Sequence, residues 1–146
     1  MKVLLALAAD AANLSTTGKL NVLGAFNTVG GPEFPLRLPS MQIVLRFECM
    51  SGEFGEPKKV QVKLLAEDGQ ELGNLEAELL LGKDLGVPRL IFDHILPIKN
   101  IDFPEPGSYA VAIVINGLEQ ARIELTVTKA ESRPQGDDDG TNPEKD

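Results

Sequence analysis

Few side chains in this sequence belong to the types that perform catalysis or bind transition metals. The only histidine, His94, follows Asp93 in a segment with strand character, and adjacent residues of a strand point to opposite faces of a sheet. Asp93 therefore cannot orient His94 in the way that a catalytic base is held by its acidic partner. One histidine and one cysteine, Cys49, are also too few ligands for a nitrogen-rich or sulfur-rich metal site.

The remaining reactive groups have simpler interpretations. Cys49 ends an alternating apolar series that begins at Ile43, so we expect a small buried side chain and not a nucleophile. Glu76 and Glu78 lie on one face of one predicted strand, which is typical of a solvated surface. Carboxylates in a cleft at one end of the fold are the alternative, and they would make the protein a small hydrolase-like enzyme. We expect no cofactor, because no glycine-rich phosphate loop precedes a helix.

Charge and composition exclude several classes of partner. The net charge of −8 is uneven: residues 131–146 hold six acidic and two basic residues, net −4, which leaves 16 acids and 12 bases, also net −4, in residues 1–130. No basic stripe is present, so we expect no nucleic acid partner. No apolar stretch is long enough to span a membrane. The absence of Trp and the single Tyr disfavour a sugar-binding surface, which uses aromatic platforms.

The elements that must position any site are short strands. Apolar and β-branched residues alternate or cluster in residues 3–9, 19–29, 41–49, 60–66, 72–81 and 89–96, and again in the two halves of a hairpin within residues 103–127. Turn residues separate these segments, and residues 30–40 and 97–106 are predicted to be irregular because of their prolines. The pattern predicts an all-β fold, a single antiparallel β-sandwich of about eight strands, immunoglobulin-like, over residues 1–129. Residues 130–146 are predicted to form a disordered acidic tail.

The hairpin around Asn116-Gly117 is the clearest local signal. A two-residue turn would place Val111 opposite Arg122, whereas a three-residue loop of Ile115, Asn116 and Gly117 would place Val111 opposite Ala121. We prefer the three-residue loop, with Tyr109 opposite Ile123, because it gives one continuous apolar face. The discarded register would leave an apolar face that needs a partner to cover it.

Tyr109 follows a Pro-Gly turn at the start of a strand. This arrangement resembles the tyrosine corner of immunoglobulin-like sandwiches, in which the hydroxyl group bonds back to nearby backbone. The alternative is an ordinary turn followed by a half-buried tyrosine.

The N-terminal segment also has two interpretations. Residues 3–9 are uniformly apolar and predict a first strand that is covered on both sides. A lysine, this apolar run and Ala9-Asp10-Ala11 also resemble a secretory signal peptide, although the run is short. We expect a cytoplasmic protein, and a secreted one if residues 1–11 are a signal peptide.

Three segments together resemble a family of small bacterial proteins of unknown function. They are LAADAANLSTTGKLNVLGAFNTV near the N-terminus, MQIVLRFE in the third strand, and FPEPGSYAVAIVINGLEQARIEL at the end of the folded part. The opening follows the pattern Ala-Asp-x-Ala-Asn, then Gly-Lys-Leu-Asn-x-Leu-Gly-x-Phe, and the end contains Pro-Gly-x-Tyr. The resemblance covers about residues 3–128, implies no activity or site, and favours an unprocessed first strand.

We therefore expect a non-catalytic protein-interaction or structural module whose partner is another protein or a second copy. Sandwiches bind through loops at their ends or through a free strand edge. The last two strands place small apolar groups beside polar ones on their outer face. The candidate interaction surface consists of Ala110, Ala112, Val114, Asn116, Gly117, Gln120 and Arg122. The alternative for this face is an ordinary solvated sheet surface.

Overall fold

The computed structural model describes residues 1–83 and 86–130, and these form nine strands and a single 3-10 turn, Ser51–Glu53. The strands are β1 (Lys2–Leu14), β2 (Leu20–Phe26), β3 (Thr28–Gly31), β4 (Leu36–Met50), β5 (Lys58–Leu65), β6 (Glu71–Leu79), β7 (Arg89–Phe103), β8 (Gly107–Ile115) and β9 (Leu118–Lys129). None of the described residues forms a helix long and apolar enough to cross a membrane.

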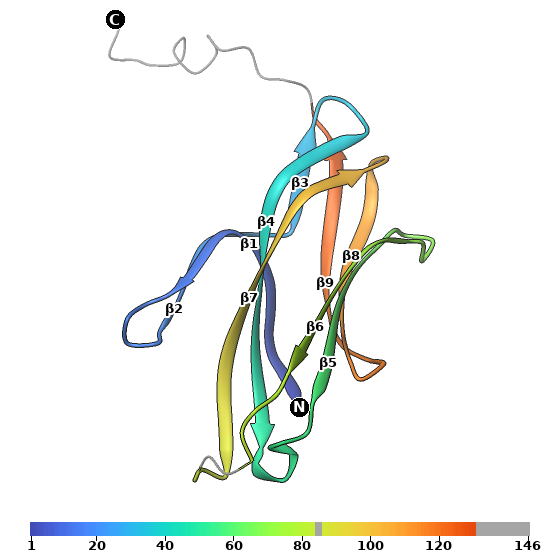
Figure 1. Cartoon of the computed structure of the whole chain (residues 1–146). Helices are drawn as coiled ribbons and strands as arrows, with labels where there is room; N and C mark the ends of the chain where they lie inside the picture. Colours follow the sequence, from blue (N-terminus) through green and yellow to red (C-terminus); the bar gives the residue numbers. More distant parts are fainter. Residues whose placement is uncertain (84–85, 131–146) are drawn as a thin grey trace, which may run out of the picture.

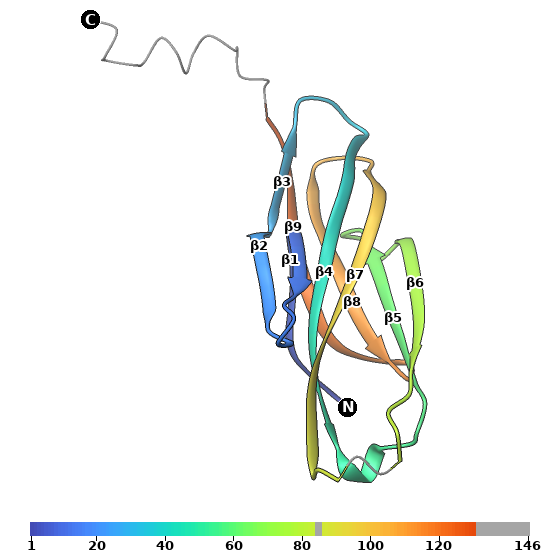
Figure 2. The same ribbon diagram turned by 60° about the vertical axis from the view of Figure 1, so that its left-hand side comes forward.

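The strands form two sheets that face each other (Figures 1 and 2). The first sheet has the order β2-β1-β4-β7 and the second has the order β3-β9-β8-β5-β6. All pairs are antiparallel except β3 with β9, which is parallel. The all-β prediction is confirmed, but the structure has nine strands and not eight, and one of its pairs is parallel.

One hydrophobic core joins the two sheets. The first sheet contributes Ala8, Met41, Ile43, Leu45, Phe47, Ile101 and Phe103, and the second contributes Val29, Val60, Val62, Tyr109, Val111, Ile113, Ile115, Ile123, Leu125 and Val127. In the central strand β4, Ile43, Leu45 and Phe47 alternate inward as the two-residue period of a strand requires. Phe34 and Leu36 also pack against this core, as expected from the sequence.

The additional strand comes from residues 19–29, which were predicted to be continuous. The chain leaves the first sheet after Phe26, where β2 pairs with β1, and enters the second sheet at Thr28, where β3 pairs with β9. The amide of Thr126 bonds to the carbonyl of Asn27 at 2.9 Å and anchors this crossing. The two-residue apolar period of Leu20, Val22 and Phe26 would continue at Thr28, but Val29 is the buried residue, so the period breaks where the chain changes sheets.

The two segments predicted to be irregular are irregular only at residues 32–35 and 104–106; residues 36–40 and 97–103 are strands, and these two strand segments pair with each other. Leu36 pairs with Phe103 and Leu38 with Ile101, so β4 and β7 extend through most of residues 36–50 and 89–103. Near Pro39 both strands change the face that they present inward, because Leu38 and Met41 both face the core and so do Ile98 and Ile101. Near Pro39 the structure therefore has a bend in two paired strands and not a loop.

The hairpin of β8 and β9 differs from the preferred register. Ile115 pairs with Leu118, so Asn116 and Gly117 form a two-residue turn with φ angles of 49° and 82°, as a type I′ turn requires. A register shift beside Ile113 then places Val111 opposite Ile123. The three-residue loop and its pairings are wrong, but the predicted inner face is correct, because a bulge returns the apolar residues to one side.

The tyrosine corner is present. The hydroxyl group of Tyr109 donates to the carbonyl oxygen of Glu105 at 2.6 Å and accepts from the Glu105 amide at 3.3 Å. The ring packs edge-on against Phe103, with 5.0 Å between ring centroids. These contacts fix the turn that leads from β7 into β8.

The structure of the two ends of the chain bears on the predicted first strand and on the predicted start of the tail. The first strand runs to Leu14, beyond the predicted Ala9, and β1 lies between β2 and β4. Loss of residues 1–11 would thus remove the strand that joins β2 to the sheet. The predicted tail begins at Ala130, whose amide bonds to the carbonyl of Gly31 at 2.8 Å, and residues 131–146 lie outside the described residues.

Candidate functional site

The predicted interaction surface is largely covered by its own neighbours. Ala110, Ala112 and Val114 on the outer face of β8 are buried, and Ala112 is only 1% exposed. Ala112 lies between Lys63 of β5 and Arg122 of β9, whose long side chains cover a small methyl group. The expectation of an exposed row of small apolar groups is wrong, because a central strand has long residues on both sides.

The other four residues of that surface are exposed, but two of them have internal partners. The side chain of Asn116 accepts a hydrogen bond from the Lys59 amide at 2.9 Å and ties the turn to β5. Arg122 forms a two-point ion pair with Glu119, at 2.8 and 3.2 Å. This pair raises the pKa of the Arg122 guanidinium and lowers that of the Glu119 carboxyl through the hydrogen bonds and the opposite charge. Gly117 and Gln120 complete the exposed set, and its binding role stays a prediction.

The residues with catalytic chemistry are separated in the structure. Asp93 bonds to Arg46 at 2.7 and 3.1 Å on the outer face of the first sheet, whereas His94 lies opposite Leu45, whose side chain is in the core. Burial lowers the pKa of His94. Cys49 is buried as expected, and burial raises the pKa of its thiol. Within residues 1–83 and 86–130, no group of three acidic, histidine or cysteine side chains could hold a metal ion.

Glu76 and Glu78 are exposed on the edge strand β6. Glu76 accepts a hydrogen bond from Gln61 at 2.8 Å and lies 3.6 Å from the ammonium group of Lys59. These contacts belong to a solvated sheet surface. Neither glutamate lines any of the three hollows described for this structure.

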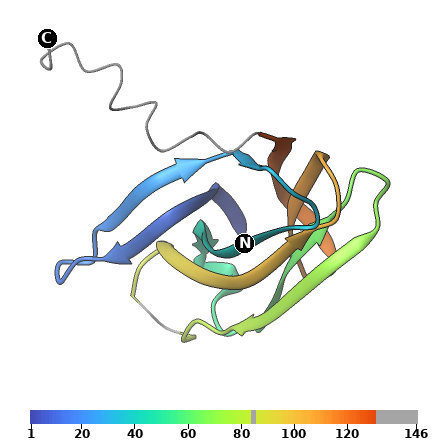
Figure 3. The same ribbon diagram turned by 90° about the horizontal axis from the view of Figure 1, so that it is seen from above.

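Exposed apolar side chains lie in a different region, which we call the arm and define as residues 10–26. It comprises the end of β1, a turn, and β2, and it projects from the side of the sandwich (Figures 1 and 3). Two hydrogen bonds close the turn. The Ser15 backbone amide donates to the Lys19 carbonyl oxygen at 2.8 Å, and the Lys19 backbone amide donates to the Ser15 hydroxyl oxygen at 3.0 Å. The arm is therefore a closed hairpin, and Phe26 at its base is its only residue that packs against the core.

The arm exposes apolar side chains. Leu23 is 73% exposed, Leu14 is 49% exposed and Val22 is 36% exposed. Asn13 and Asn21 form a cross-strand pair, in which the side-chain amide group of Asn21 donates to the side-chain oxygen of Asn13 at 3.0 Å. Gly24 has a φ angle of 70°, and a side chain there would meet the Asp10 carboxylate. Glycine is favoured at this position, because other residues rarely adopt this conformation and a Cβ atom there would force the Asp10 side chain to move.

A shallow groove adjoins the base of the arm. It lies between the first sheet and β9, and Ala25, Phe26, Arg122 and Glu124 are among its lining residues. Arg122 is thus the one member of the predicted surface that also borders this groove. Sequence reasoning missed the arm because Leu20, Val22 and Phe26 alternate like a strand that packs on a core. The available signal was the absence of charge from residues 20–26.

Comparison with known proteins gives a family but no activity. A search of curated proteins finds no match. Among solved structures, the chain is similar to the alkylpurine DNA glycosylase AlkC of Pseudomonas fluorescens, bound to DNA with an abasic site analogue, at 12% identity and a TM-score of 0.40; the similarity covers 70% of this chain and only 28% of the glycosylase. It is also similar to an immunoglobulin-like protein of Pseudomonas aeruginosa, at 14% identity and a TM-score of 0.35, covering 82% of this chain and 90% of that protein.

The family match covers almost all of the described fold. Residues 4–128 match DUF6941, a family of unknown function. This span includes the arm, both sheets and the tyrosine corner, and it agrees with the extent of the resemblance found in the sequence. The chain therefore belongs to the DUF6941 family of proteins of unknown function.

Proposed function

We propose that this protein is a non-catalytic interaction module that binds another protein through the free edge of β2 in the arm. The observation that carries the proposal is the unprotected character of this edge. β2 pairs with β1 on one side only, and its residues, LNVLGAF, include no charge and no proline. Such an edge offers unpaired backbone groups to an incoming strand.

The terminal strands elsewhere in the two sheets are protected. Charges or proline occur in β6, which has Glu71, Glu76 and Glu78, and in β7, which has Arg89, Asp93, Pro97, Lys99 and Asp102. β3 is only four residues long. These are the features by which proteins prevent unwanted strand addition. The contrast supports a role for β2 in binding, since the same chain protects its remaining terminal strands.

The surroundings of β2 suit a protein partner. A strand added beside β2 would meet the exposed Leu23 and Val22, which supply apolar contact on the two faces of the sheet. The groove at the base of the arm, with Arg122 and Glu124 on its border, supplies polar groups next to this apolar surface. An apolar centre with a polar margin is the usual composition of a protein interface.

The test compares three immobilised proteins: the wild type and two variants, each with one exposed leucine replaced by lysine. Leu23→Lys places a charge on the β2 edge, and Leu118→Lys places the same charge on a leucine that is 65% exposed at the start of β9. Extracts of the source cell are passed over the wild type and both variants, and the retained proteins are quantified by mass spectrometry. We expect at least one protein that the wild type and Leu118→Lys retain and Leu23→Lys loses. Identical sets on all three baits would contradict binding through β2.

Self-association is measured on the same proteins. Sedimentation equilibrium of the wild type shows whether the partner is a second copy, in which two β2 strands pair about a two-fold axis. A dimer that Leu23→Lys dissociates and Leu118→Lys preserves would identify the copy as the partner. A monomer in all three proteins, combined with a specific retained protein, would identify a different chain.

A further inference from the structure

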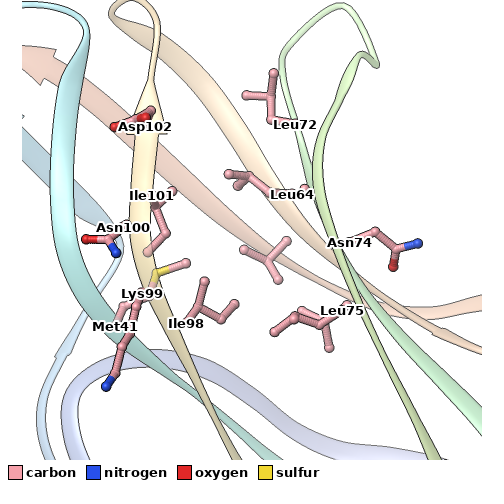
Figure 4. A pocket seen from close by; sticks show the side chains of 13 residues that line it. Met41, Leu64, Leu72, Asn74, Leu75, Ile98, Lys99, Asn100, Ile101 and Asp102 are labelled. Carbon is pink, nitrogen blue, oxygen red and sulfur yellow. The ribbon is translucent and has the colours of Figure 1, made fainter.

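A second region, independent of the arm, has the properties of a small-molecule site. A cavity of about 270 Å³ opens between the two sheets on the flank where β6 and β7 are the edge strands. Figure 4 shows aliphatic side chains from both sheets directed toward one space, and the labelled ones are Met41, Leu64, Leu72, Leu75, Ile98 and Ile101. The amide of Asn74 is turned away from this space (Figure 4). The interior of the cavity is therefore aliphatic, and its polar residues lie at the margin.

Backbone irregularities on both sides border the same cavity. Asn100 in β7 has a φ angle of 56°, and the other non-glycine residue with a positive φ in the described chain, Asn116, belongs to a hairpin turn. Asn100 lies inside β7 at the bend near Pro39, between Lys99, which pairs with Ser40, and Ile101, which pairs with Leu38. Opposite it, the pairing of β5 with β6 shifts between Leu64 and Leu65. Strained residues and bulges concentrate at ligand-binding sites. The presence of both at this cavity supports a ligand-binding role for it.

A glycine on the inner face of β6 leaves the space open. Gly73 pairs with Leu64, which packs against the core, and cross-strand partners share one face of a sheet. A Cβ atom at Gly73 would have no other atom within 4 Å, and its φ angle is not positive. The position would therefore accept a larger side chain, and any such side chain would enter the cavity.

We propose that this cavity binds an aliphatic chain. A cavity of about 150 Å³ with a similar apolar lining accepts benzene, so a volume of about 270 Å³ suits a ligand of roughly ten non-hydrogen atoms. No aromatic side chain lines the cavity, which favours a flexible aliphatic chain over a stacked ring. The gap between two edge strands allows a polar head group to remain in solvent.

The first experiment titrates the wild-type protein with 1-octanol and follows its methyl groups by NMR. The proposal predicts saturable shifts at Leu64, Leu72, Leu75, Ile98 and Ile101, and no comparable shifts at the exposed Leu23 and Leu118. Triethylene glycol, a chain of similar length with ether oxygens, is the matched probe and should cause no such shifts. Absence of saturable shifts at the cavity methyl groups, or equal shifts with triethylene glycol, would overturn the proposal.

The second experiment fills the cavity. Gly73→Leu should weaken octanol binding at least tenfold, because its side chain occupies the space of the ligand. Gly52→Leu is the matched control, since Gly52 also has open space around it and no positive φ, but it lies in the 3-10 turn, and we expect binding within twofold of the wild type. If Gly73→Leu does not fold, Leu64→Phe fills the same space from β5. A folded filling variant that binds octanol like the wild type would overturn the assignment.

Discussion

The two flanks of this protein use the same kind of residue in opposite ways. On one flank, β2 carries Leu23 into solvent on an arm that has no charged residue along its edge strand. On the other flank, β6 and β7 carry charges along their edges and enclose Leu64 and Ile101 around a cavity. The first arrangement suits a partner strand and the second suits a small apolar ligand. The charge and shape of the neighbouring strand thus decide whether these apolar side chains face solvent or a cavity.

The largest difference between the flanks should appear in stability. Ile101→Ala should lower the free energy of unfolding by roughly 2–5 kcal/mol, because it removes a side chain that is 5% exposed and packs in the core. Leu23→Ala should change it by no more than about 0.5 kcal/mol, as expected for an exposed residue. Chemical denaturation of both variants measures the difference. Equal effects would show that the arm packs against something other than solvent.

Glycine-to-alanine substitutions on the two flanks should change the stability of the protein in opposite directions. Gly24→Ala should destabilise the arm by about 1–2 kcal/mol, because φ at Gly24 is 70° and the Asp10 carboxylate occupies the Cβ position. Gly73→Ala should stabilise the protein by about 0.4–1 kcal/mol through reduced freedom of the unfolded chain.

Hydrogen exchange resolves the two glycine effects by region. Gly24→Ala should accelerate exchange within the arm, and Gly73→Ala should leave the arm unchanged. A stabilising effect of Gly24→Ala would mean that the arm adopts another backbone conformation at this position.

Acid should weaken the sandwich through Glu53, the last residue of the 3-10 turn that follows β4. This carboxylate accepts bonds from the N-terminal ammonium group, from the Met50 amide and from Lys58. The ammonium group, followed by the other two donors, lowers the pKa of Glu53 to about 2, against the cost of burial. Its contribution to stability is therefore complete above its ordinary pKa of 4.5 and is lost as the pH falls toward about 2.

Denaturation of the wild type and of Glu53→Gln between pH 7 and pH 2 measures this contribution. We expect it to be about 1 kcal/mol after screening by solvent. Glu53→Gln should be less stable at pH 7 and should show a smaller slope between pH 4.5 and 2. An identical slope in both proteins would assign the acid sensitivity to other carboxylates.

The smallest effect concerns the two asparagines with positive φ angles. Asn100→Gly should raise the free energy of unfolding by about 0.5 kcal/mol, because glycine adopts this conformation without strain while the unfolded chain gains freedom. Asn116→Gly should instead lower it by about 1 kcal/mol, because it removes the hydrogen bond to the Lys59 amide. Thermal unfolding of both variants makes the comparison. If Asn100→Gly lowers the free energy of unfolding as much as Asn116→Gly does, the Asn100 side chain also stabilises the fold.

Local chemistry was sufficient to predict several features of the fold. The alternation of apolar residues placed Tyr109, Val111 and Ile123 on the inner face of the hairpin, since a strand repeats every two residues. The hydrogen bond from Tyr109 to Glu105 spans four residues, so the turn before the strand was enough to suggest it. Cys49 was correctly expected to be buried because its neighbours in the series Ile43, Leu45 and Phe47 are apolar.

The features on which the two proposals rest depend on contacts between residues that are distant in the sequence. Ala112 is buried in a central strand, where Lys63 and Arg122 of two other strands flank it. The strand from Leu36 to Ser40 forms because residues 99–103 pair with it, although Pro39 and the preceding Pro32 and Pro35 predict a loop. The arm and the cavity are both edge properties, and strand order decides which strands are edges. A single sequence specifies the period of each strand through short-range sterics, whereas the partner of each strand is selected by burial across the whole chain, and that selection left β2 free and placed β6 opposite β7.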